Sequence, residues 1–174
     1  YCYTDVPFIA EEFEKANLQQ KSIRLEPSGL LKESMVFSQI DYKGIVKEQE
    51  WEDSIWYETL TQRFLFVVFR KSPEKDNKKA VLEKVFFWTM PHKDLAIAKC
   101  FWQDTKEKIA ADDFSHFWKL SDHKICHVRP KAKNNTDKME TPSGRMITKK
   151  GYWLNAEYIL DVIKANMKIE EEQK

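Results

Sequence analysis

The feature that most constrains the fold of this chain is the run "FLFVVFRK", residues 64–71. Its first six residues are all aromatic or aliphatic, with no polar residue between them. A short apolar run of this kind predicts a strand, and the lack of polar alternation predicts that both of its faces are buried. We therefore expect this strand at the centre of a sheet that is flanked by helices.

The rest of the chain mixes strand and helix patterns without a regular alternation. Strand patterns occupy residues 18–26, 34–42, 80–91, 124–128 and 146–154. The turn signal Pro27-Ser28-Gly29 predicts that the first two form a hairpin. Helical spacing marks residues 51–64 and 92–112, and Asn155 is placed to cap a closing helix. These elements predict one α/β domain of mixed α+β type over residues 1–174, with a central mixed β-sheet.

The composition excludes several classes of protein. The three cysteines, Cys2, Cys100 and Cys126, are widely spaced and form no C-x-x-C pair. This excludes a disulfide framework and a zinc knuckle, and it fits the reduced cytoplasm of a bacterium. No apolar run approaches the ~18 residues that a membrane span needs, so we expect no membrane partner. The chain starts at Tyr1 without an initiator Met, which suggests part of a longer protein.

Charge is distributed unevenly along the chain. The net charge is only +1, which by itself argues against a polybasic nucleic-acid binder. Between Lys124 and Lys150, however, eight cations accompany only two acids, Asp137 and Glu140. This segment could contact an anionic partner while the rest of the chain stays acidic or neutral. The alternative is an ordinary solvated loop.

The first candidate site is the stretch "HVRPKAKNNTD", residues 127–137. Lysine and arginine can bind guanine O6 and N7, asparagine can pair with adenine N6 and N7, and any cation can contact a phosphate. Pro130 stiffens the stretch, although tandem asparagines beside lysines are also common in plain loops. The candidate DNA-contacting residues here are Arg129, Pro130, Lys131, Lys133, Asn134 and Asn135.

The second candidate site is "KKGYWLN", where Lys149 and Lys150 precede a glycine and two aromatic residues. In an extended segment Tyr152 and Trp153 point to opposite faces, so one ring should be exposed. An exposed ring beside cations can stack on a base or wedge into a base step, but it can also plug a sheet edge. We count Arg145, slightly upstream, with the two lysines as a DNA-backbone contact.

Motifs for acyl transfer, nucleotide hydrolysis and zinc binding are missing from the sequence. The four histidines show no H-x-x-x-H or HExxH spacing, and the four glycines form no phosphate-binding loop. No Ser, His and Asp arrangement or G-x-S-x-G is found. His127 could donate to a phosphate, but we favour a structural role for it.

The segment "EEFEKANLQQKSIRL", residues 11–25, carries an incomplete metal-site pattern. Many DNA hydrolases hold Mg²⁺ with an acid at the start of one strand and a Glu or Asp two residues before a Lys on the next. Glu12 could be the first acid and Lys21 the lysine, but the neutral Gln19 stands at the second acidic position. We interpret these three residues as a degenerate site and expect no metal in this domain.

The order of these motifs resembles the MutH family, which comprises the mismatch-repair nicking endonuclease and the GATC-cutting Sau-type type II restriction endonucleases. The resemblance covers nearly the whole chain and is carried by "LQQKS", "WEDSIWYETLTQRFLFVVF", "HVRPKAKN" and "TKKGYWLNAEYI". The chain is most similar to the C-terminal half of the Sau-type enzymes. In that family this half keeps the fold, has lost the metal site and binds a further copy of the recognition sequence as an allosteric effector.

The resemblance implies roles for particular residues and partners. The family's metal site falls on Glu12, Gln19 and Lys21, where only the lysine is unchanged; Lys131 falls on the base-contacting position and Trp153 on the intercalating aromatic. It also implies a restriction-endonuclease-like fold and double-stranded DNA with a GATC-like site. The N-terminal catalytic domain of the same chain is the implied protein partner, and only that domain would use Mg²⁺. Dimer formation stays open.

Three functions remain under consideration. The first is a sequence-specific DNA-binding effector domain of a type II restriction endonuclease, without cutting activity of its own. The second is an active Mg²⁺-dependent MutH-like endonuclease, in which Gln19 is tolerated or the acid is supplied by Glu14, by Glu26 or by the N-terminal arm that the resemblance implies before the first acid. The third is a protein-interaction domain that kept the fold and uses its aromatic surface to dimerise with the catalytic half.

Overall fold

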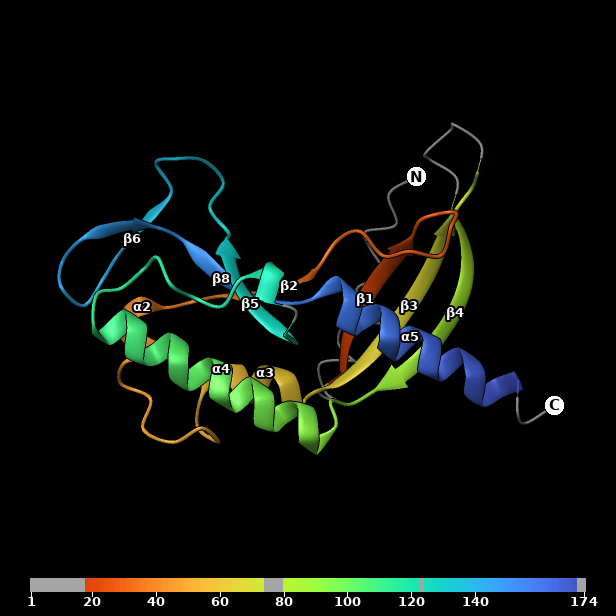
Figure 1. The fold of residues 1–174 in the computed structure, drawn as a ribbon, viewed down its shortest axis with the longest axis horizontal. Coiled ribbons are helices and arrows are strands. Elements are labelled where there is room, and N and C mark those ends of the chain that lie inside the picture. Colours follow the sequence, from red (N-terminus) through yellow and green to blue (C-terminus); the bar gives the residue numbers. More distant parts are fainter. Residues whose placement is uncertain (1–17, 74–79, 123, 172–174) are drawn as a thin grey trace. The chain divides into compact units, whose positions relative to one another are not determined.

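The structure is a computed structural model that describes residues 18–73, 80–122 and 124–171 (Figure 1). Its strands are β1 (Leu18–Leu25), β2 (Met35–Gln39), β3 (Arg63–Lys71), β4 (Ala80–Trp88), β5 (Cys126–Pro130), β6 (Lys138–Glu140), β7 (Met146–Thr148) and β8 (Lys150–Leu154). Its helices are α2 (Tyr42–Ile45), α3 (Ile55–Thr61), α4 (His92–Ala110), α5 (Ala156–Glu171) and the 3-10 helix η1 (Leu120–Asp122). The mixed α/β class predicted from the sequence is confirmed.

The chain divides into two compact units, each assembled from two separate stretches of sequence. One consists of Tyr1–Lys32 and Leu60–Met90, and the other of Glu33–Thr59 and Pro91–Lys174. The single domain over residues 1–174 stays a prediction. Along the described ranges, no helix combines the length and the apolarity that crossing a bilayer requires.

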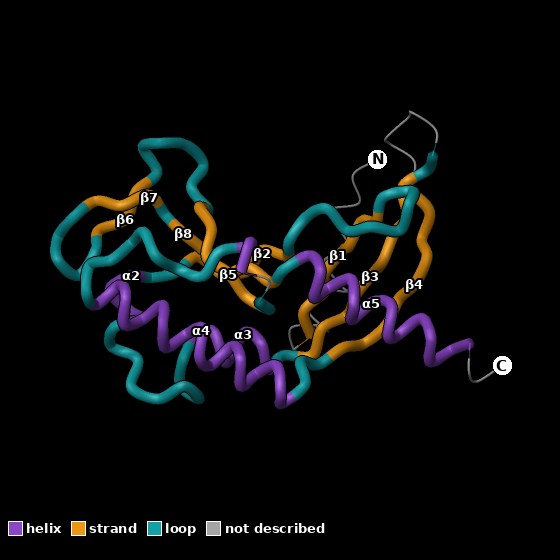
Figure 2. Tube along the Cα trace, in the orientation of Figure 1, coloured by secondary structure: helices purple, strands orange, loops and turns teal. Residues whose placement is uncertain are grey.

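The first unit contains a mixed three-stranded sheet in the order β1-β3-β4 (Figures 1 and 2). Strand β3 pairs in parallel with β1 and antiparallel with β4. The run of residues 64–71 is therefore the central strand of this sheet, as predicted. Its burial differs from the prediction, because Phe64, Phe66 and Val68 are fully buried while the alternate residues on the other face are only half-buried.

The predicted hairpin between residues 18–26 and 34–42 is wrong. The turn itself is present: Gly29 has a φ of 82° and its N–H donates to Glu26 O at 2.9 Å. After the turn, however, the chain leaves this sheet, and β2 pairs with β8 in the second unit. A turn signal fixes only a local change of direction, whereas the partner of β1 is set by the long apolar strand β3, against which Ile23 and Leu25 become buried.

The second unit contains an antiparallel three-stranded sheet in the order β2-β8-β5 and a separate two-stranded ribbon, β6-β7 (Figure 2). The predicted strand over residues 146–154 is split in two at Lys149, since β7 pairs with β6 and β8 with β2 and β5. Aromatic rings fill the core beneath the sheet. Trp56 stacks on Tyr152 at 4.6 Å between ring centroids and meets Phe37 edge-on at 5.4 Å.

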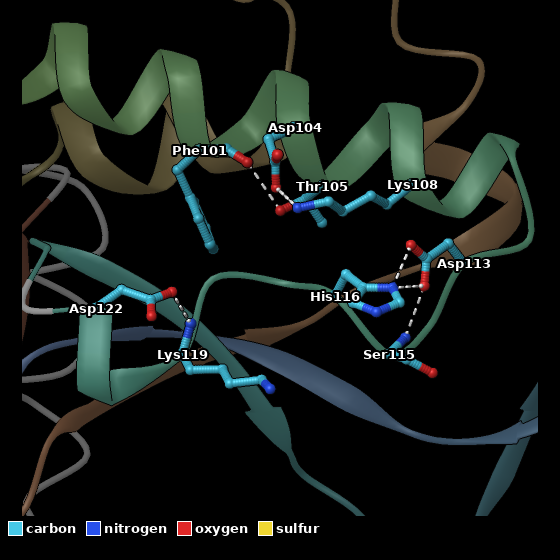
Figure 3. A network of polar contacts seen from close by, with 9 residues as sticks. All are labelled: Phe101, Asp104, Thr105, Lys108, Asp113, Ser115, His116, Lys119 and Asp122. Carbon is cyan, nitrogen blue, oxygen red and sulfur yellow. Dashed lines mark hydrogen bonds and ion pairs between the residues drawn. The ribbon is translucent and has the colours of Figure 1, made fainter.

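Helix α4 agrees closely with the predicted helix at residues 92–112. It buries Phe101 and Trp102, and the indole N–H of Trp102 donates to Glu48 Oε2 at 2.5 Å. Figure 3 shows the polar bonds along the helix and the segment after it, including the Lys108–Asp104 ion pair at 2.7 Å. These bonds fix the end of α4, from which the chain returns toward β5.

Candidate nucleic-acid interface

The antiparallel sheet of the second unit has two chemically different faces. Strand alternation directs Val128, Tyr152 and Leu154 into the aromatic core, where all three are buried. The opposite face, called here the outer face, is formed by Val36, His127, Arg129, Gly151 and Trp153, which are neighbours in the register of β2, β8 and β5. Alternation thus places the predicted intercalating Trp153 beside the predicted DNA-contacting Arg129.

A loop at residues 131–137, called here the basic loop, extends from the end of β5 and returns toward β6. Both of its ends are bonded to the main chain of Lys149: Lys131 N–H donates to Lys149 O at 2.8 Å, and Lys149 N–H donates to Asp137 O at 3.2 Å. The side chain of Asp137 adds two further links, an ion pair with Lys149 Nζ at 2.5 Å and a bond from Lys133 N–H at 3.0 Å. The loop is therefore held closed by one carboxylate, and the bond with Lys149 lowers the pKa of Asp137.

Asn134 organises the interior of the basic loop. Its Oδ1 accepts hydrogen bonds from Thr136 N–H at 3.0 Å, from Thr136 Oγ1 at 2.7 Å and from Asp137 N–H at 3.1 Å. Pairing with adenine would require this same oxygen to accept from N6 while Nδ2 donates to N7. The Oδ1 of Asn134 is therefore already occupied by hydrogen bonds within the loop. The neighbouring Asn135 is exposed and is better placed to meet a base or phosphate.

The side chain of Lys131 crosses directly over strand β8. A Cβ added to Gly151 would lie 2.9 Å from Lys131 Cδ and 3.0 Å from Ser38 O, so only glycine leaves room for this crossing. The Lys131 ammonium donates to Phe37 O. A lysine held in this way must release that carbonyl before it can bind a base edge. Pro130, the last residue of β5, is exposed beside it.

Arg129 and Trp153 form a cation–π pair on the outer face. The guanidinium carbon lies 5.1 Å from the indole centroid. On its other flank Trp153 stacks with His127, with 6.2 Å between ring centroids and 23° between planes. Trp153 is half-buried, so it is a partly exposed ring bordered by a cation. Such a ring can stack on a base or sugar edge.

The three predicted backbone-contacting cations, Arg145, Lys149 and Lys150, already contact other groups of the protein. Arg145 Nε pairs with Asp112 Oδ2 at 2.7 Å, and its Nη2 donates to Asp112 O at 2.9 Å. Lys150 lies on the core side of β8, with its ammonium 5.8 Å from the ring of Phe117, and burial lowers its pKa. Lys149 is tied to the basic loop as described above. These three residues are therefore weaker candidates for phosphate contacts than the sequence suggested.

The degenerate metal site falls partly on described residues. Gln19 and Lys21 are two residues apart on β1 and so share one face of that strand, with Ile23 and Leu25. Glu12 lies outside the described residues. Within the described ranges, no group of three or more His, Cys, Asp or Glu side chains could hold a metal ion. The expectation that this domain binds no metal stays a prediction.

A cluster of Asp113, Ser115 and His116 contains the residue types of a hydrolytic triad but not its geometry. His116 Nδ1 bonds Asp113 Oδ2 at 2.8 Å, while Ser115 reaches the same carboxylate through its main-chain N–H at 3.0 Å. In Figure 3 the Ser115 hydroxyl points away from the imidazole. The histidine therefore cannot take a proton from this serine as arranged, and the cluster is a hydrogen-bonded Asp113–His116 pair near the end of α4.

Two residues with clear roles here were not assigned one from the sequence: Asp137 and Gly151. Asp137 was counted only as an acid inside a basic segment, although an Asp that closes an Asn-rich loop is a recognisable turn signal. No sequence signal indicates that Gly151 makes room for Lys131, because the contact joins the basic loop to strand β8, and these meet only in the fold.

Comparisons with known proteins agree with the resemblance found in the motifs. A family model described as "DNA mismatch repair enzyme MutH" matches residues 9–100. The chain is also 30% identical, over 192 aligned residues, to the type II restriction enzyme Sau3AI of Staphylococcus aureus. That alignment covers 86% of this chain and 38% of the relative, so the chain spans well under half the length of the curated protein it matches.

Proposed function

This chain belongs to the MutH family, and on that premise we propose that it is a sequence-specific double-stranded DNA-binding module. We further propose that it recognises a GATC-like site and acts as the non-cutting effector domain of a type II restriction endonuclease. The observation that carries the proposal is the outer face with its basic loop. There Arg129 of β5 lies over a partly exposed tryptophan, and the basic loop that follows β5 is closed by its own hydrogen bonds.

The charge of this surface supports contact with DNA. Arg129, Lys131 and Lys133 are exposed, and within the described ranges neither Arg129 nor Lys131 contacts a carboxylate, whereas the charge of Lys133 acts on Asp137, which also accepts its main-chain N–H. Cations without acidic partners release counterions when they meet phosphates, and this release supplies most of the sequence-independent affinity for DNA. A chain with a net charge of only +1 can thus bind a polyanion through one surface.

The shape of the loop supports recognition of a sequence. Its internal bonds from Asp137 and Asn134 leave few main-chain conformations, so little conformational entropy remains to be lost when DNA binds. In the proposed complex the loop enters the major groove, where Lys131 contacts guanine O6 or N7 and Arg129 and Lys133 contact phosphates. Trp153 packs against or between bases at the edge of the site.

Catalysis is assigned to another part of the protein. Mg²⁺ in a nuclease needs oxygen anions, and Gln19 offers only a neutral amide oxygen where the family pattern has an acid. Lys21 alone could polarise water but could not hold the ion. We therefore propose that Mg²⁺ serves a separate N-terminal catalytic domain, which is also the proposed protein partner of this module.

A plasmid-nicking assay tests the absence of cutting. With Mg²⁺ present, the purified chain should leave supercoiled plasmid containing GATC sites intact. Nicked or linear products that disappear in Lys21→Ala would instead establish the active-nuclease alternative. Gln19→Glu is the complementary variant, since restoring the second anion should increase Mg²⁺ affinity if the site is a degenerate one.

An electrophoretic mobility shift tests sequence recognition. The chain should bind a duplex with one GATC site more tightly than a scrambled duplex of equal length and composition, both measured at one stated salt concentration. Equal weak binding to both would refute sequence recognition, and no binding to either would favour the protein-interaction alternative.

A further inference from the structure

Asn155 stands just before helix α5 but does not cap it. A helix-preceding asparagine usually accepts a hydrogen bond from an N–H in the first turn. Here Ala156 N–H instead bonds Ser34 Oγ at 3.3 Å, and the side chain of Asn155 is directed elsewhere. The predicted cap is therefore wrong, and the buried amide of Asn155, 2% exposed, has another partner.

That partner is His127. Asn155 Nδ2 donates to Lys124 O, which fixes the orientation of the amide and turns Oδ1 toward His127 Nδ1. Since Oδ1 can only accept, Nδ1 of His127 must carry the proton. His127 is fully buried, and its Nε2 has no hydrogen-bond partner within the described ranges. The imidazole is thus held by one side chain in one tautomer.

The held imidazole lies beside Trp153 on the outer face. His127 and Trp153 are directly opposite each other in the β5–β8 register, and their rings are stacked. Arg129 then covers part of the same indole. A continuous series of contacts therefore runs from the buried amide of Asn155, through His127 and Trp153, to the guanidinium of Arg129.

We propose that His127 and Asn155 are positioning residues that hold the indole of Trp153 in one orientation for DNA contact. The proposal rests on the proposed function. An apolar residue would fill the space of His127 equally well, but it would have no bond to fix the plane of its ring. The Asn155 bond supplies that restraint, at the expense of the helix cap.

The neutral state of the imidazole is consistent with this role. Burial lowers the pKa of His127, and the nearby guanidinium of Arg129 acts in the same direction. A neutral ring stacks against Trp153 without repelling Arg129 from the outer face. The indole N–H of Trp153 is itself buried and unbonded within the described part of the chain, so the ring depends on stacking to stay in place.

The test uses Asn155→Ser, which keeps a hydroxyl able to cap α5 but is too short to reach both His127 and Lys124 O. Its matched control is Ser34→Ala, which removes the bond to Ala156 N–H at the same helix end without touching His127. In the free protein, the NMR signal of the Trp153 indole, assigned with Trp153→Phe, should shift or broaden in Asn155→Ser and stay unchanged in Ser34→Ala. An unchanged signal in Asn155→Ser overturns the proposal whether or not DNA binds.

A double-mutant cycle on DNA affinity provides the second measurement. Asn155→Ser should weaken binding to the GATC duplex roughly threefold to tenfold, as expected when one large side chain must be ordered on binding. In a Trp153→Ala background the same change should have no further effect. Equal losses in both backgrounds, or the same loss in Ser34→Ala, would show a general structural role and overturn the proposal.

A second variant and a separate outcome complete the design. If Asn155→Ser does not fold, His127→Phe keeps a ring against Trp153 but cannot bond Asn155, and the same outcomes apply to it. If the unmodified chain binds no duplex while the Trp153 signal responds as expected, the proposed function fails and the positioning of the ring stands.

Discussion

Two groups of cations between Lys124 and Lys150 differ in what they already contact. The first group, called here the first end, is Arg129, Lys131 and Lys133; the second end is Arg145, Lys149 and Lys150. At the first end, Arg129 lies over an aromatic ring and Lys131 bonds a main-chain carbonyl, while Lys133 donates its main-chain N–H to Asp137 and its charge acts on the same carboxylate. At the second end, Arg145 and Lys149 are in ion pairs with aspartates.

This difference shows why counting cations is a poor guide to a DNA-binding surface. A cation that keeps its carboxylate adds little to phosphate binding, because the acid repels the same phosphate that the cation attracts. A ring or a carbonyl carries no net charge and leaves the cation's field intact. The two ends look equivalent in sequence. The cations of the first end keep more of their positive field available to a polyanion, because an aromatic ring or a carbonyl does not neutralise them.

The largest effect is expected from Lys131→Ala, which would sharpen the comparison at the first end. Loss of a base contact should reduce affinity for the GATC duplex by ~1 to 3 kcal/mol and relax the preference at one base pair. Binding to a panel of duplexes with single base-pair changes measures this. An equal loss on every duplex would mean that Lys131 contacts the backbone only.

The next effect concerns Asp137→Asn, which changes the acid that connects the two ends. Removing its negative charge should strengthen binding to scrambled DNA, since one charge that repels phosphates is gone. Loss of the ion pair with Lys149 should at the same time loosen the basic loop and weaken binding to the GATC duplex. The ratio of the two affinities should therefore fall, and Asp112→Asn, at the Arg145 pair, is the matched control. A ratio that stays constant would contradict the role of the loop.

A smaller effect separates phosphate contacts at the two ends. Lys133→Ala should reduce the slope of log affinity against log salt by about one unit. Lys150→Ala should leave the slope unchanged, because its ammonium lies against Phe117 on the core side. Titrations at several salt concentrations compare the two variants, and equal slopes would remove the distinction drawn here.

The smallest effect is on stability and involves His127, which lies on the same face of β5 as Arg129. Its pKa is lowered in the folded chain below the usual 6.5, so on acidification the unfolded chain takes up this proton before the folded chain does. The free energy of unfolding should therefore fall as pH decreases through 6.5. Urea unfolding at pH 7.5 and at lower pH should show a weaker decline in His127→Phe. An identical decline in both proteins would assign the effect to other groups.

Much of the fold could be predicted from patterns that local chemistry controls. The central strand β3 and helix α4 have strong periodic signals, and their predicted ranges agree with the structure. The partners of β1 and β2 could not be predicted, because pairing depends on which apolar strand is available elsewhere in the chain. The break at Lys149 was missed for the same reason, since nothing local indicates that β7 and β8 join different sheets.

The candidate site shows the same division. Strand alternation, which a sequence displays, separates Tyr152 from Trp153, whereas the register of β5 with β8 places Trp153 on the same face as Arg129. The inward role of Asn134 and the core-facing side of Lys150 depend on hydrogen bonds and registers that only three-dimensional contacts define. Residue types therefore indicated which surface to consider, whereas the three-dimensional contacts determine which of its side chains are free to contact DNA.

The order of strands in the second unit has a consequence for how the protein is made on the ribosome. Its middle strand, β8, follows both of its neighbours in sequence, and among the described residues β2 and β5 each pair with β8 alone. Neither flanking strand has a neighbour until residue 154 has left the exit tunnel, so a nascent chain stopped before that point has no outer face. Assembly of this surface therefore waits until β8 has emerged, after Arg129 and Lys131 have already been incorporated.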